Sequence, residues 1–128
     1  MVAVGIVLLL VGSCSIYVHH PHLSTSPALA IDLSARRPKG SAYQATITNR
    51  DACEAILSEL RAARFVGFGA AANGEMTIRY ANGKADRVLL MWSPDHSDLL
   101  FFHHGFYKTP AERFFTKLKD GGIDVTKL

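Results

Sequence analysis

The middle of the chain alternates between apolar and polar positions in the way that antiparallel strands do. From Met76 to Tyr80 every second residue is apolar, and this period of two predicts a strand with one solvent-exposed face. Asn82-Gly83 follows, a dipeptide that favours a tight hairpin because both central positions of the turn need positive φ. Val88–Trp92 and the first half of Leu99–Tyr107 are apolar on both faces, which is typical of inner strands. The stretch Glu75–Tyr107 therefore predicts an antiparallel meander.

The register of the first hairpin depends on the length of its turn. A two-residue turn at Asn82-Gly83 places Arg79 opposite Asp86, which is a favourable cross-strand pair. A three-residue loop through Lys84 would instead place Arg79 opposite Arg87. The two-residue turn is the preferred prediction.

A first helix is predicted from about Arg50 to Ala63. It follows Thr48-Asn49-Arg50-Asp51, which resembles a capping box. Its apolar face has the spacing of three and four residues that an amphipathic helix requires. That face consists of Cys53, Ile56, Leu57 and Leu60, whereas Glu54, Glu59 and Arg61 lie off it.

A second helix is predicted to begin at Thr109-Pro110-Ala111-Glu112. Thr109 is the expected cap, Pro110 suits the first helical position, and Glu112 completes a capping box. The helix should end before Gly121-Gly122. Its inward side chains are Phe114, Phe115 and Leu118.

Three shorter segments complete the predicted domain. Tyr43–Ile47 alternates weakly and predicts a first strand, Phe65–Ala72 a short extra strand, and Ile123–Leu128 a tail or a short final strand. The fold class expected for residues 43–128 is α+β. It is an antiparallel three- to four-stranded meander with two flanking helices, preceded by an N-terminal apolar helix.

Residues 1–18 form an apolar segment without a charged side chain. Three interpretations remain open. The segment is an uncleaved membrane anchor, or the apolar part of a secretory signal cut after Ala28-Leu29-Ala30. Alternatively, Val11-Gly12-Ser13-Cys14 resembles a bacterial lipoprotein site in its small residues before a cysteine. The expected localisation is therefore membrane-anchored or secreted and periplasmic, with the orientation undecided.

Residues 19–42 are predicted to be a linker, because they combine Pro21, Pro27 and Pro38 with several serines and show no periodicity. Arg36, Arg37 and Lys39 form a basic cluster in this linker. If the anchor is retained, this cluster pulls the domain toward the cytoplasm.

Charge argues against a nucleic-acid-binding protein. The formal charge is +3, from 14 Lys and Arg and 11 Asp and Glu. Once the three basic residues of the linker and Asp32 are set aside, 11 basic and 10 acidic residues remain in residues 43–128. A nearly neutral domain lacks the one-sided basic surface that phosphate binding needs.

Two motifs match active or binding sites only in their letters. Gly67–Ala72 reads G-x-G-x-x-A, but a dinucleotide loop needs a helix N-terminus after it, and here Asn73-Gly74 follows. Asp95-His96-Ser97-Asp98 places acid, imidazole and hydroxyl side by side, but neighbours on a turn rarely converge on one reacting atom. No catalytic, cofactor-binding or metal-binding residue is assigned, and the protein is expected not to be an enzyme.

Histidine is the residue type in this chain that suggests a metal site, because neutral imidazoles can bind Zn²⁺ or Cu²⁺. The histidines form two groups, which are His19, His20 and His22, and His96, His103 and His104. Adjacent residues on a strand point to opposite faces, so His103 and His104 are not expected to share a metal ion. Cys53 is expected to be a small core residue of the first helix.

The apolar character of both faces of the inner strands carries the functional hypothesis. Two helices either cover one face each or leave one face partly bare, and a bare apolar face is a candidate contact surface. Leu89 and Val88 represent the two faces. The sequence favours a non-catalytic binding module with a protein partner at an apolar sheet face, and with the membrane as a partner of residues 1–18 if they are uncleaved. The alternatives are a His-mediated Zn or Cu site and a small hydrolase-like enzyme.

Overall fold

The computed structural model describes residues 20–36 and 42–128 as an α+β fold with one seven-stranded antiparallel sheet. The predicted apolar helix of residues 1–18 lies outside the described residues. The strands are β1 (Ala28–Ala35), β2 (Tyr43–Ile47), β3 (Arg64–Phe65), β4 (Gly74–Tyr80), β5 (Ala85–Trp92), β6 (Leu99–Phe102) and β7 (Phe106–Thr109). The helices are α2 (Arg50–Arg61), α3 (Ala111–Asp120) and the short 3-10 helix η1 (Val125–Lys127).

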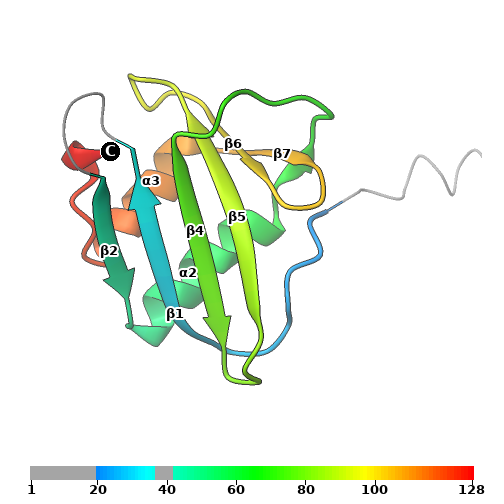
Figure 1. Ribbon diagram of the computed structural model, residues 1–128, viewed down its shortest axis with the longest axis vertical. Coiled ribbons are helices and arrows are strands. Elements are labelled where there is room, and N and C mark those ends of the chain that lie inside the picture. The colour runs from blue at the N-terminus through cyan, green and yellow to red at the C-terminus, as the bar shows by residue number, and fades with distance from the viewer. Residues whose placement is uncertain (1–19, 37–41) are drawn as a thin grey trace, which may run out of the picture.

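The strands follow the order β2-β1-β4-β5-β6-β7-β3 across the sheet. Helices α2 and α3 both lie behind the sheet in Figure 1, so they cover the same face. We call this the inner face and the opposite side the outer face. The arrangement with α2 and α3 on opposite faces is therefore wrong, and no helix within residues 20–36 and 42–128 covers the outer face. In the described part of the chain, no helix is both long and apolar enough to cross a membrane.

Strand β1 corrects the prediction of a linker over residues 19–42. Ala28–Ala35 lies inside the sheet and pairs with both β2 and β4, with Ile31 opposite Ile47 on one side and Ile78 on the other. Prolines flank this strand but do not interrupt it, and its side chains alternate between buried and partly exposed positions after an irregularity at its start. Tertiary pairing therefore outweighs the loop-like composition of the surrounding residues.

The segment before β1 is also packed against the domain. Pro21 and Leu23 are buried. A ring nitrogen of His20 lies 3.0 Å from the carbonyl oxygen of Ala63, and Arg61 donates a 2.8 Å hydrogen bond to the carbonyl of Ser24. Residues 20–27 therefore form part of the fold rather than a spacer.

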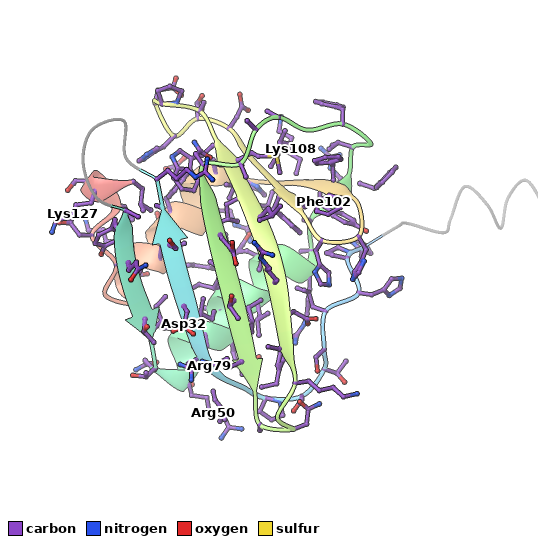
Figure 2. All side chains as sticks on the ribbon, viewed as in Figure 1. Asp32, Arg50, Arg79, Phe102, Lys108 and Lys127 are labelled. Atoms are coloured by element: carbon purple, nitrogen blue, oxygen red, sulfur yellow. The ribbon has the colours of Figure 1, made fainter. Side chains whose placement is uncertain are left out.

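The register of the β4–β5 hairpin differs from both predictions. Ile78 pairs with Asp86 around a three-residue turn, because Tyr80 N–H bonds to the carbonyl of Lys84 at 2.9 Å. In this register the Tyr80 hydroxyl donates a 2.8 Å hydrogen bond to Asp86. Arg79 instead forms an ion pair with Asp32 of β1 at 3.0 Å, and the two lie side by side in Figure 2.

The predicted third strand, Leu99–Tyr107, is in fact two strands. A turn at His103–Gly105 separates β6 from β7, which then pair with Phe102 opposite Phe106. His104 has φ 53° and Gly105 has φ 149°, values that reverse the chain and that glycine adopts most readily. The apolar pattern predicted extended backbone correctly but gave no signal for this turn.

The buried faces of both helices are as predicted, but the predicted N-cap residues are only partly correct. Asn49 caps α2 by accepting a 3.0 Å hydrogen bond from Ala52 N–H. Helix α3 has Pro110 at its cap position with no side-chain hydrogen bond, so the prediction of Thr109 as the cap is wrong. The Thr109 hydroxyl instead donates to the carbonyl of Glu59 at 3.4 Å, because α2 lies beside the start of α3. Residues predicted as a tail or final strand form η1.

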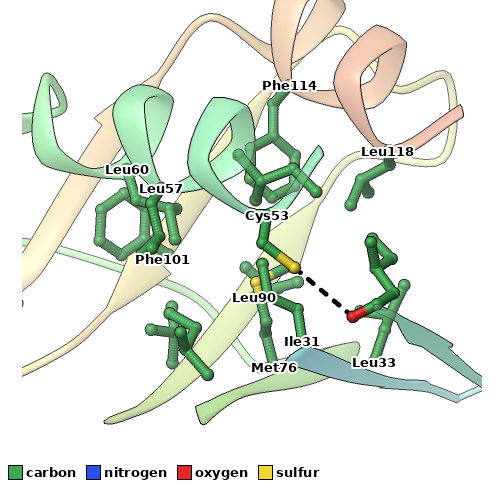
Figure 3. Close-up of a cluster of buried hydrophobic side chains, with 14 of the residues drawn as sticks. Ile31, Leu33, Cys53, Leu57, Leu60, Met76, Leu90, Phe101, Phe114 and Leu118 are labelled. Atoms are coloured by element: carbon green, nitrogen blue, oxygen red, sulfur yellow. Dashed lines mark hydrogen bonds between the residues drawn. The ribbon is translucent and has the colours of Figure 1, made fainter. Parts of the chain in front are cut away.

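The core lies between the inner face and the two helices. All seven helix residues predicted to point inward are buried. Figure 3 shows several of them packed against side chains from β1, β4, β5 and β6, including Ile31, Met76, Leu90 and Phe101. Cys53 is fully buried here, its thiol donates to the carbonyl of Ile47 at 3.5 Å, and burial raises the pKa of this thiol.

Gly74 offers a test of packing at the start of β4. A Cβ atom at this position would lie 2.6 Å from the ring of Trp92 and 3.3 Å from the carbonyl oxygen of Ser34. Gly74→Ala is therefore expected to lower the free energy of unfolding by about 1–3 kcal/mol, as overpacking does. Urea denaturation measures the loss. Adding Trp92→Leu to Gly74→Ala should recover part of the lost unfolding free energy. If the losses of the two single variants simply add in the double variant, the steric explanation is wrong.

Candidate functional site

The outer face divides into a polar half and an apolar half. Strands β2, β1 and β4 carry polar side chains there, including Thr46, Asp32 and Arg79, and the Thr46 hydroxyl donates to Asp32 at 2.7 Å. At the border of this half Arg87 donates two hydrogen bonds to Glu75, at 2.6 and 2.7 Å. The Glu75 carboxylate raises the pKa of Arg87 by hydrogen bonding and by charge. The charged side chains named here are therefore paired with one another.

The apolar half lies over β5, β6 and β7. A cavity of about 260 Å³ opens there, and it is surrounded by aliphatic and aromatic side chains. We call its lining residues the sheet patch, which consists of Ala70, Ala72, Leu89, Met91, Phe102 and Phe106. The register explains this grouping, because Leu89, Phe102 and Phe106 lie directly opposite one another on successive strands.

The loop between β3 and β4 forms one wall of the sheet patch. Gly69 lies so close to the ring of Phe106 that a Cβ atom would be 2.1 Å from it. The Ala70 N–H points at the sulfur of Met91, 3.3 Å away. At the end of the loop the Asn73 side chain exchanges two hydrogen bonds with the backbone of Trp92, at 2.8 and 2.9 Å. These contacts fix the wall without covering the cavity.

Phe102 is the exposed aromatic side chain of the sheet patch. It is 38% exposed and its ring lies 5.0 Å from that of Phe106, in a tilted arrangement. Figure 2 shows Phe102 on the side of the sheet where the N-terminal segment joins the fold. The sheet patch contains no titratable group, so it can bind apolar side chains but cannot transfer a proton.

The histidines of the β6–β7 turn lie differently from the prediction. Because His104 adopts a positive φ, its ring lies 4.7 Å from that of His103, so the prediction that the two point to opposite faces is wrong. The ring nitrogens of His103 lie 3.0 Å from the carbonyl oxygen of Arg87 and 3.3 Å from that of His22. Over the described residues, no three His, Cys, Asp or Glu side chains are grouped so that they could hold a metal ion. His19 and Cys14 lie outside these residues.

A buried polar cluster around Asp86 was missed from the sequence. Its carboxylate accepts hydrogen bonds from the Tyr80 hydroxyl at 2.8 Å and from the Ser24 N–H at 2.9 Å, and His103 lies 3.8 Å away. Burial, and then the bond to Asp86, raise the pKa of Tyr80 far above its ordinary value. These contacts attach the segment before β1 to the sheet. The signal in the sequence was limited to an acidic residue, Asp86, just before the apolar run Val88–Trp92.

The Asp95–Asp98 segment forms a turn. Asp95 accepts hydrogen bonds from the hydroxyls of Ser93 and Ser97 at 2.8 and 2.7 Å, and the bond from Ser97, followed by that from Ser93, lowers its pKa to about 2. His96 points elsewhere. It stacks on Phe115 at 4.4 Å, and a ring nitrogen lies 3.2 Å from the carbonyl of Leu128. Acid, imidazole and hydroxyl therefore do not converge on one point.

A further cavity of about 460 Å³ lies at the start of α3, where Arg64, Lys108 and Arg113 meet. Its charges are largely balanced, because Lys108 lies 3.5 Å from Asp98 and Arg113 lies 2.8 Å from Glu59. The cavity is therefore not a strongly cationic site.

Gly67–Ala72 has the backbone of an exposed loop. Strand β4 follows it, and there is no helix N-terminus to face a pyrophosphate. Comparison of the chain with family models, with curated proteins and with solved structures found no match. The candidate site is therefore defined by geometry alone, and the sheet patch is an apolar cavity on the outer face of the described sheet.

Proposed function

We propose that the protein is a membrane-anchored, non-catalytic interaction module, held by residues 1–18, whose sheet patch receives an apolar side chain of a protein partner. The observation that carries this proposal is that both helices cover the inner face, so an apolar cavity stays open on the outer face. Burying one large apolar side chain contributes about 1.5–3 kcal/mol, which makes such a cavity an effective anchor point.

Charge around the sheet patch indicates the chemistry of the partner. Arg64 lies opposite Lys108, and Lys108 lies opposite Leu100, so both cations point to the outer face beside the patch. Both side chains are exposed, and Asp98 is the acidic residue that lies near Lys108. Because Asp98 balances Lys108, Arg64 is the cation that a partner would meet here, and a partner segment with an apolar residue next to one acidic residue fits this surface best.

Photo-crosslinking tests the proposal. A photoreactive phenylalanine analogue at position 102 of the full chain should give a discrete adduct with one protein in the native membrane. Leu89→Asp should weaken binding of that purified protein about tenfold or more, since it places a charge in the apolar contact. Leu89 is partly exposed, so the substitution should leave the fold intact.

Two matched variants make the result specific. Thr77→Asp places the same charge on the polar half of the outer face and should leave binding unchanged. Val88→Asp points into the core, where Val88 is fully buried, and should unfold the domain. Equal binding by the Leu89→Asp and Thr77→Asp proteins would contradict the proposal, as would the absence of a specific adduct.

A further inference from the structure

The loop from Val66 to Ala72 exposes apolar surface close to the point where the chain enters the fold. It contains no charged residue, and most of its residues are exposed. Phe68, at its centre, is 65% exposed, and Phe65, just before it, is 52% exposed. We call Phe65 and this loop the edge loop. Exposed aromatic side chains gathered in this way are costly in water and mark a contact surface.

The N-terminal segment joins the fold beside the edge loop. A ring nitrogen of His20 lies 3.0 Å from the carbonyl oxygen of Ala63, two residues before Phe65. A Cβ atom at Gly105 would lie 3.5 Å from the Phe65 ring. In the same turn, a ring nitrogen of His103 lies 3.3 Å from the carbonyl oxygen of His22. The start of the described chain and the exposed aromatic residues therefore lie on the same edge of the molecule.

The distance from the apolar segment to this edge is short. The apolar run ends at Val18, only two residues before His20. Two residues span at most about 7 Å. If the run inserts in a membrane, the domain cannot be held away from the lipid, because residues 20–27 are packed into the fold instead of forming a spacer.

We propose that the edge loop rests on the surface of the bilayer into which residues 2–18 insert, with Phe65 and Phe68 in the headgroup region. This inference rests on the membrane anchoring in the proposed function. Aromatic side chains favour the membrane interface, where an apolar body and a polar surrounding are both available. Arg64 and Lys108, on the neighbouring strands, can contact anionic lipid headgroups.

This placement leaves the rest of the sheet in water. Strands β3 and β2 form opposite edges of the sheet. Six strand spacings separate them, or about 29 Å, which is much more than the depth of a headgroup layer. A reporter at β2 is therefore a control for a reporter in the edge loop.

Tryptophan fluorescence tests the inference on the full chain in vesicles of phosphatidylcholine and phosphatidylglycerol. The single native tryptophan is removed by Trp92→Phe, and a new one is introduced by Phe68→Trp or, as the control, by Gln44→Trp on β2. Lipids with brominated chains should quench the tryptophan at 68, and iodide in the buffer should quench only the one at 44. Ala71→Asp in the first protein should lower the ratio of docked to free loop about tenfold. Asn82→Asp, in the β4–β5 turn, should not change it.

Three other outcomes would overturn the inference, and the measurements distinguish them. If the protein does not float with the vesicles, residues 2–18 do not insert and the membrane part of the proposed function fails with it. If it floats but iodide quenches both reporters, the anchor is correct and the docking of the edge loop is wrong. If neither quencher reaches position 68, another protein surface covers the loop, such as a second copy of the chain.

Discussion

A chain shortened to residues 43–128 is expected to lose cooperative folding, although the sequence predicts these residues as the whole domain. The missing strand β1 pairs with β2 on one side and β4 on the other. Without it β2 loses its neighbour in the sheet, and the buried side chains of Ile31 and Leu33 leave the core. Two lost strand pairings and this apolar burial amount to about 10 kcal/mol, which equals the total stability of a typical domain.

Chains that begin at different residues test this prediction. A chain that starts at His20 keeps β1 and the contacts of residues 20–27, and it should unfold in one cooperative transition. A chain that starts at Ile31, as cleavage after Ala30 would produce, loses Ala28 and Ala30 and the hydrogen bond from Ala28 N–H to Glu54. It should be markedly less stable. Thermal unfolding followed by circular dichroism compares the three chains.

The stabilities of these chains also test the predicted cleavage after Ala30. The Ala28-Leu29-Ala30 pattern resembles a cleavage site in the sequence, but in the structure it begins a strand whose two alanines are buried. Cleavage there would have to precede folding. If the chain that starts at Ile31 is as stable as the one that starts at His20, residues 20–30 do not contribute to the stability of the fold, and the hydrogen bond from Ser24 to Asp86 has no stabilising role.

How far the sequence predicts the fold depends on the kind of signal each element carries. Helices α2 and α3 have clear helical periodicity, β4 alternates, β2 alternates weakly and β5 contains a continuous apolar run, and the structure confirms all five elements. Strand β1 was predicted as part of a linker without periodicity, because it contains small residues and has prolines around it. Its stability comes from pairing with strands that are far away in sequence, and no local pattern records this.

The candidate site also depends on long-range contacts that no local sequence pattern records. Apolar residues on both faces of β5 and β6 left open whether the two helices cover one face each or leave one face bare, and the structure places both helices on the inner face. The sequence also could not show that the β3–β4 loop forms a wall of the sheet patch through Gly69 and Asn73. The sequence also did not predict the positive φ of His104, which brings its ring close to that of His103.

Glu59 is the residue whose environment departs most from its prediction. Helical spacing placed it off the apolar face of α2, yet it is only 3% exposed because α3 packs beside it. Its carboxylate accepts hydrogen bonds from Lys117 at 2.7 Å and from Arg113 at 2.8 Å. Burial alone would raise the pKa of Glu59, but the bond and charge of Lys117, and then of Arg113, lower it below its ordinary value.

Removal of both cations by Arg113→Gln and Lys117→Gln is expected to cost about 3 kcal/mol of unfolding free energy at pH 7, because it leaves a buried carboxylate without a counter-charge. Lys117 should account for most of the loss, since Arg113 is 69% exposed and solvent weakens its contribution. The control is Lys84→Gln with Lys119→Gln, which removes the same charge from exposed positions. Urea denaturation compares the proteins, and equal losses would show that the buried pairing adds nothing.

The dependence on pH separates this explanation from a simple loss of packing. In the native protein the pKa of Glu59 is lowered, so its contribution to stability is present above the ordinary pKa of 4.5 and is lost as pH falls below it. In the double variant burial acts alone and raises that pKa, so this site should gain stability as pH falls. Adding Glu59→Gln to the double variant removes the buried charge and should restore stability at pH 7. If that third substitution lowers stability further, the carboxylate was not the source of the loss.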